Sequence, residues 1–266
     1  MDSNMPKYEA ATGVAAYLIL GFNIIAIYNV IELTFMICER FKRHSRLYYW
    51  VLLVTTYGIA AYAVGSILKI KMPSPKSYVY LTLIEVGWIA MVTGHSMVLW
   101  SRLHLLLNSP FWLKTTIYMI VFNAIMCHIL PAILTCDAKI INLVILASPY
   151  SFDGRIQVTI FSIQEFIISA IYISRALNLI RLRTATREYW GCGRLMQHLI
   201  VVNIVIILLD TTILGLVYAG YSDVQTSYQS FVYSVKLKLE FSILDRLGDL
   251  QEDEKARSAC HEDNHQ

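Results

Sequence analysis

Four titratable side chains lie deep inside long apolar stretches of the sequence. They are Glu85, His128, Glu165 and Asp210. At about 1.5 Å of rise per helical residue, each lies roughly 12 to 15 Å from the outer end of its predicted helix. An ionisable group at such a depth in a bilayer is costly, and it usually marks a functional site. The four residues therefore predict one chemically active layer to which four helices contribute.

The chemistry that suits such a layer is proton transfer in a dry cavity. Burial disfavours the anion of a carboxylic acid, so a buried acid keeps its proton and can donate it. Helical spacing places Trp88 and His95 on the same face as Glu85. It also places Tyr172 on the face of Glu165. Aromatic faces stabilise cations, so we expect protonation of an olefin or epoxide followed by guidance of the carbocation.

These features assign a role to each candidate residue. We expect Glu85 and Asp210 to be the proton donor and its carboxylate partner. Glu165 and His128 are the reserve candidates for the base that takes the final proton. The reaction requires no metal and no cofactor, and the sequence lacks the aspartate clusters that hold magnesium against a diphosphate. The residues expected to stabilise the cation or contact the substrate are Trp88, Tyr172 and His95.

A purely structural interpretation stays open for these residues. Glu85, Glu165 and Asp210 can instead be neutral, hydrogen-bonded contacts between helices. His128 precedes Pro131 and can bind carbonyl groups that a proline leaves without a donor.

The composition indicates that these residues belong to a membrane protein. Of the 266 residues, 56% are hydrophobic and 15% are charged, whereas a soluble domain has about 25% charged residues. The mean hydropathy is +0.53. Such a chain lacks the polar surface to cover a soluble globule. We therefore expect it to lie in a lipid bilayer, and we expect it not to bind nucleic acid. The five cysteines form no CxxC pair, which argues against a zinc site or a disulfide framework.

Seven apolar stretches are long enough to cross a bilayer, which predicts an all-α membrane protein with a seven-helix bundle. The last stretch is the weakest because Lys236, Lys238 and Glu240 interrupt it, so a helix on the membrane surface stays open. Lys236 and Glu240 are four residues apart, and we expect them to pair. The predicted spans are 11–37, 48–70, 77–106, 115–136, 156–180, 198–220 and 225–244.

The distribution of Lys and Arg orients the bundle. Sixteen of these residues lie on the side of the C-terminus and six on the opposite side, which predicts a cytosolic C-terminus and an outer or lumenal N-terminus. Residues 1–10 form a short N-terminal segment, 11–244 the seven-helix domain, and 245–266 an acidic tail expected to be disordered. We expect no cleaved signal peptide, and a multi-pass location in the endoplasmic reticulum or another endomembrane.

Two stretches resemble a known group of proteins. They are TGHSMVLWSRLHLL at 93–106 and YSVKLKLEFSILDRL at 233–247. Both resemble a widespread group of fungal seven-helix integral membrane proteins, which is similar to the membrane-bound terpene cyclases of meroterpenoid pathways, of the ascofuranone and macrophorin kind. The resemblance implies an isomerase-type cyclase of secondary metabolism that acts on a hydrophobic, farnesylated substrate beside other membrane enzymes of the pathway. No catalytic residue is carried over from this resemblance.

Two other classes of protein stay open. Seven helices with an outer N-terminus suit a receptor. However, the residue directly before Arg102 is not acidic, and no NPxxY motif occurs in the last span. A retinal protein would use Lys236, but position 232 is Val where the usual microbial pattern has Asp. A transporter would have repeated halves or broken helices, and only Pro131 interrupts a predicted span.

Overall fold

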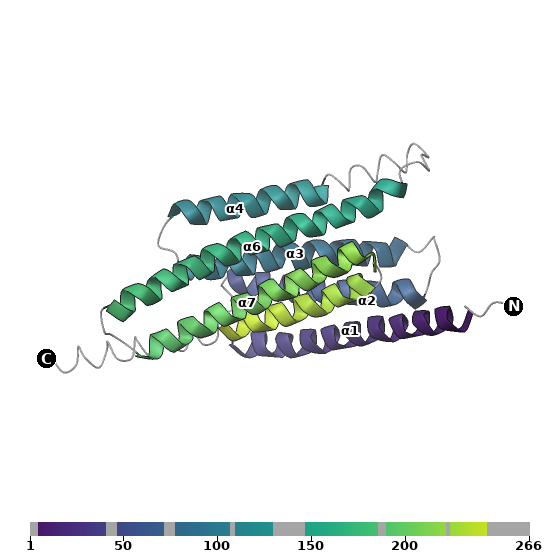
Figure 1. Ribbon diagram of the computed structural model, residues 1–266, viewed down its shortest axis with the longest axis horizontal. Coiled ribbons are helices and arrows are strands. Elements are labelled where there is room, and N and C mark those ends of the chain that lie inside the picture. The colour runs from purple at the N-terminus through teal and green to yellow at the C-terminus, as the bar shows by residue number, and fades with distance from the viewer. Residues whose placement is uncertain are drawn as a thin grey trace.

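The computed structural model is helical throughout the long segments that it describes, which are 5–40, 47–71, 78–106, 110–129, 147–185, 190–221 and 224–243. The helices run along the long axis of the molecule (Figure 1). They are α1 (Met5–Arg40), α2 (Leu47–Lys71), α3 (Tyr78–Leu106), α4 (Pro110–Ala124) with the π-helical turn η1 (Ile125–Ile129), α6 (Ala147–Ala185), α7 (Trp190–Ala219) and a C-terminal helix at 224–243. The all-helical fold class is confirmed, and each predicted span overlaps one of these helices. The predicted acidic tail lies outside the described residues.

Five of the helices are long and apolar enough to cross a membrane. The sixth apolar helix, Phe111–Cys127, is shorter. Large apolar side chains such as Tyr17, Phe35 and Phe122 cover the outside of the bundle, as expected where lipid is the solvent. These helices indicate a multi-pass membrane protein. The five spans are Ala15–Glu39, Tyr48–Lys69, Val79–Leu103, Gly154–Asn178 and Gln197–Ala219.

Proline and glycine mark two of the helix ends. Pro110 is the first residue of α4, where a missing N–H costs nothing. Gly220 follows α7 with a φ of 84°, a conformation that only glycine adopts readily. Within η1, the side-chain amide of Gln157 donates to the carbonyl of Cys127. This contact ties η1 to α6.

Helices α2 and α3 form the most extensive helix pair of the described bundle, and glycine makes their close contact possible. A Cβ atom on Gly87 would lie 2.5 Å from the backbone nitrogen of Tyr62 and 2.9 Å from the carbonyl oxygen of Gly58. Real Cβ atoms do not approach backbone atoms so closely, so only glycine fits at position 87. This contact fixes which face of α3 points into the bundle.

The most polar helix is also the most enclosed. Every residue of the C-terminal helix is buried or half-buried, and this helix lies between α7 and α1 in Figure 1. Asn23 of α1 donates to the hydroxyl of Ser227 at 2.9 Å and accepts from Ser230 at 2.9 Å. Asn29 donates to Ser234 at 3.0 Å. Because lipid cannot satisfy polar groups, enclosure by other helices explains this placement, and a helix on the membrane surface does not fit it.

Candidate functional site

Three charged side chains from three helices meet inside the bundle. The Nζ atom of Lys236, on the C-terminal helix, donates to Oε2 of Glu165 on α6 at 2.7 Å and to Oδ1 of Asp210 on α7. All three side chains are at most 2% exposed. A lone charge in the interior would cost several kcal/mol, so the ammonium and the carboxylates stabilise one another. We call Glu165, Asp210 and Lys236 the acid cluster.

Two aromatic rings extend the acid cluster towards α3. The hydroxyl of Tyr233 donates to Oε1 of Glu165 at 3.3 Å, and the Tyr233 ring lies 4.6 Å from Nζ of Lys236. His95 of α3 contacts the Tyr233 ring edge to face, with 5.4 Å between the ring centroids. His95 is fully buried, and neither of its ring nitrogens has a hydrogen-bond partner in the described part of the chain. Such an imidazole is placed to accept or donate a proton.

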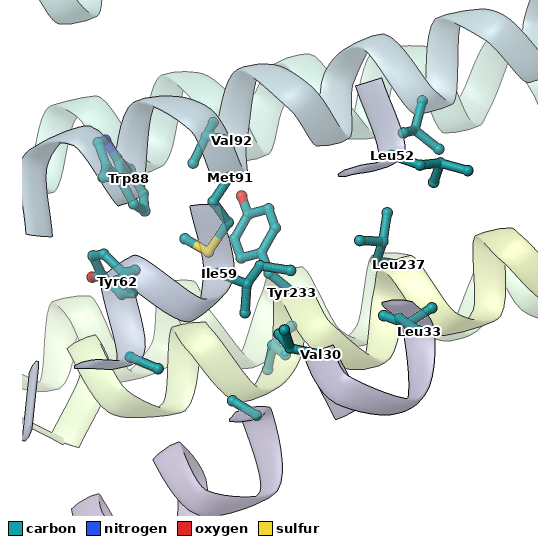
Figure 2. Packing of buried hydrophobic residues seen from close by; sticks show 14 of the residues in the cluster. Val30, Leu33, Leu52, Ile59, Tyr62, Trp88, Met91, Val92, Tyr233 and Leu237 are labelled. Atoms are coloured by element: carbon teal, nitrogen blue, oxygen red, sulfur yellow. The ribbon is translucent and has the colours of Figure 1, made fainter. Parts of the chain in front are cut away.

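Aromatic side chains pack beside the acid cluster towards the start of α3. The Trp88 ring lies 6.3 Å from the Phe161 ring, edge to face, and 6.0 Å from the Tyr62 ring. Phe161 precedes Glu165 by one helical turn on α6. Figure 2 shows Tyr62 and Trp88 at one side of the buried cluster and Tyr233 near its centre. The acid cluster therefore adjoins an aromatic wall formed by Tyr62, Trp88, Phe161 and Tyr233.

A second buried ion pair lies one helical turn away. Nε of Arg102 is 2.6 Å from Oε2 of Glu240, and both side chains are at most 1% exposed. The guanidinium also donates to Oδ1 of Asn203 at 3.4 Å, and it lies over the Tyr172 ring at 4.9 Å. The expected pair between Lys236 and Glu240 is therefore wrong. Each of these two residues instead pairs with residues of other helices.

The structure brings most of the predicted site residues into the interior. Asp210 and Glu165 meet in the acid cluster, and Trp88, Tyr172 and His95 are buried. Tyr172, however, contacts Arg102 and not the acid cluster.

Glu85 lies outside this arrangement. Its side chain is exposed on α3, so the prediction that it faces into the bundle is wrong. The close contact between Gly87 and α2 turns the buried face of α3 away from Glu85. His128 belongs to η1, and its side chain lies outside the described residues.

Sequence reasoning missed the central residue, Lys236. The spacing of Lys236 and Glu240 favoured a local pair, although their position in the most polar span was itself a signal of enclosure. In the described part of the chain, no group of three or more His, Cys, Asp or Glu residues is placed to hold a metal ion. What the arrangement can do is bind, hold and transfer a proton.

Comparison with known proteins gives a family and no activity. No curated protein and no solved structure matches the chain significantly. One family profile matches residues 10–261, almost the whole chain, and its description is a domain of unknown function, DUF7703. The protein belongs to the DUF7703 family.

Proposed function

We propose that this protein is a membrane enzyme that cyclises a prenylated substrate with a proton from the acid cluster. One observation carries the proposal: two buried carboxylates share one ammonium beside an aromatic wall. Segments 93–106 and 233–247 resemble a group of fungal seven-helix membrane proteins that is similar to meroterpenoid terpene cyclases, and this resemblance supports the choice of a farnesylated substrate.

A balance of charges supports the presence of a transferable proton. The ammonium of Lys236 compensates only one of the two carboxylates. One added proton makes the cluster neutral, which avoids the cost of an uncompensated charge in the interior. We assign this proton to Asp210, because its Oδ2 has no hydrogen-bond partner among the described residues. Both oxygens of Glu165, by contrast, accept hydrogen bonds from Tyr233 and Lys236.

The final proton of the reaction needs an acceptor. In the proposed sequence, Asp210 protonates an olefin or epoxide, and the electrons of the chain's other double bonds close the rings. The last carbocation then loses a proton to His95, whose ring nitrogens have no other partner in the described structure. The gain and loss of one proton leave an isomer of the substrate, and the enzyme returns to its first state when His95 releases its proton and Asp210 takes one up. The rings of Trp88 and Tyr233 stabilise the intermediate cation through their electron-rich faces.

The test is conversion of substrate in isolated membranes. Microsomes from a yeast strain expressing the full chain are supplied with farnesylated phenols and their terminal epoxides, and products are identified by mass spectrometry. Asp210→Asn should lower the rate by about 100-fold or more, the usual contribution of a general acid. Glu85→Gln is the matched control, since Glu85 is exposed, and it should keep the activity.

The same preparation separates the other classes of function. Conversion that survives Asp210→Asn at equal protein abundance would contradict the proposed site. Uptake of substrate into sealed vesicles without chemical change would favour a transporter. Binding with neither conversion nor uptake would favour a receptor.

A further inference from the structure

A line of neutral polar side chains leads from the acid cluster to one end of the C-terminal helix. Gln225 is partly exposed, and its amide donates to Gln229 at 3.2 Å. Gln229 is 1% exposed and accepts a hydrogen bond from the hydroxyl of Tyr62 at 3.3 Å. One turn further along the helix, the hydroxyl of Tyr233 reaches Glu165. Amide and hydroxyl groups hydrogen-bond to water, and because they are neutral they do not repel a proton. We call this end the Gln225 end, and its side chains favour hydration.

The opposite end has a different lining. Beyond Lys236, the Arg102–Glu240 pair lies in the interior. Three fully buried leucines, Leu33, Leu52 and Leu237, lie together towards this end (Figure 2). Apolar constrictions exclude water, and the Arg102–Glu240 ion pair fills the polar positions of this end without a net charge. This end, the Arg102 end, is therefore closed by leucine packing and by an ion pair that must open before a proton can pass.

The titratable groups near this route come from several helices. The α1 helix contributes the neutral side chains Asn23 and Asn29 to the contact with the C-terminal helix, and its Glu32 pairs with Lys238 where both are about one third exposed. The titratable and charged groups near the route and its two ends are Tyr48 and Tyr62 of α2, Glu85, His95 and Arg102 of α3, Glu165 and Tyr172 of α6, Asp210 of α7, and Tyr233, Lys236 and Glu240 of the C-terminal helix.

We propose that the acid cluster exchanges protons with water only through the Gln225 end, and that the Arg102–Glu240 pair closes the other end. The inference rests on the proposed function only for the assignment of Asp210 as the proton carrier. By the distribution of Lys and Arg, the Gln225 end faces the outer or lumenal side. An enzyme built in this way renews its acid from that side without letting protons cross the membrane.

The first test opens the closed end. The full chain and the double variant Arg102→Gln with Glu240→Gln are reconstituted into liposomes that contain a pH-sensitive dye, and a potassium potential drives protons inwards. The wild type should match empty liposomes, whereas the double variant should conduct protons at least about tenfold faster, because the ion pair that closes this end is gone. Adding Asp210→Asn to the double variant should return the flux to background.

Two outcomes of this test would overturn the inference. One is a wild type that already conducts protons above background. The other is a double variant that elutes and melts like the wild type yet conducts nothing.

The second test measures the response of the wild type, and the variant Asp210→Asn serves only to assign the band. Vesicles of one orientation receive a pH step on one side at a time, and infrared difference spectra follow the carboxylic C=O band that Asp210→Asn removes. The band should respond to the Gln225 side alone. A response to both sides, to the Arg102 side alone, or to neither overturns the inference. Neither test contains a substrate, so a failure of the cyclase proposal is seen separately, as absence of product.

Discussion

Lys236 and Asp210 are ion partners in the interior, and only one oxygen of Asp210 takes part. Oδ1 accepts from the ammonium, while Oδ2 has no hydrogen-bond partner in the described structure. The lysine thereby positions the carboxyl group of Asp210 and leaves Oδ2 available to carry the proton of the proposed reaction. The stability of the bundle and the proposed proton donor thus depend on the same contact.

Replacing this lysine should destabilise the protein strongly. Lys236→Met leaves Glu165 and Asp210 buried without their ammonium, and the loss of one member of a buried pair costs about 3–5 kcal/mol. Thermal unfolding in detergent measures the effect. Lys238→Met is the matched control two residues away, because Lys238 and its partner Glu32 are about one third exposed, and such pairs contribute about 0–1 kcal/mol. Equal losses of stability in the two variants would contradict the account of the acid cluster.

The Arg102–Glu240 pair should show strong coupling in a charge swap. Arg102→Glu or Glu240→Arg alone places two like charges in contact at a site where both side chains are at most 1% exposed, so each should abolish the folded protein at ordinary growth temperature. The double swap restores opposite charges and should recover a measurable part of the protein. The recovery is incomplete because arginine at 240 is not placed to donate to Asn203. Abundance measured by size-exclusion chromatography tests this, and a double swap that gives no more folded protein than either single variant would refute the pairing.

His95 should affect the chemical step more than substrate binding. His95→Phe keeps a ring of similar size against Tyr233 but removes both nitrogens, so kcat should fall by about 100-fold while KM changes little. The corresponding control is Tyr172→Phe, since Tyr172 contacts Arg102 and not the acid cluster. A rise in KM at constant kcat would instead assign His95 to substrate binding.

The helices and part of the site follow from the sequence, for a physical reason. Apolar length alone identifies a bilayer-crossing helix, and the depth of Glu165 and Asp210 placed them in one layer. The ion pairs of Lys236 could not be predicted from the sequence. Residues four positions apart in a helix can pair locally, and contacts with other helices depend on helix rotations that the sequence does not determine. The orientation of Glu85 failed in the same way, since the rotation of α3 is set by its contact with α2 at Gly87.

That contact gives the last prediction, which separates packing from chemistry. Gly87→Ala adds a Cβ atom 2.5 Å from the backbone nitrogen of Tyr62, and backbone atoms inside a helix cannot move aside singly. Helices α2 and α3 must separate, which costs about 1–3 kcal/mol or more and shifts Tyr62 away from Trp88, whose rings now lie 6.0 Å apart. Stability and activity should therefore both fall, although no charged or catalytic group has changed. Gly21→Ala is the control, because a Cβ atom there meets nothing within 4 Å, and alanine is the better helix former by about 1 kcal/mol. Its melting temperature should stay level or rise, and a loss equal to that of Gly87→Ala would mean that α2–α3 packing does not set the aromatic wall.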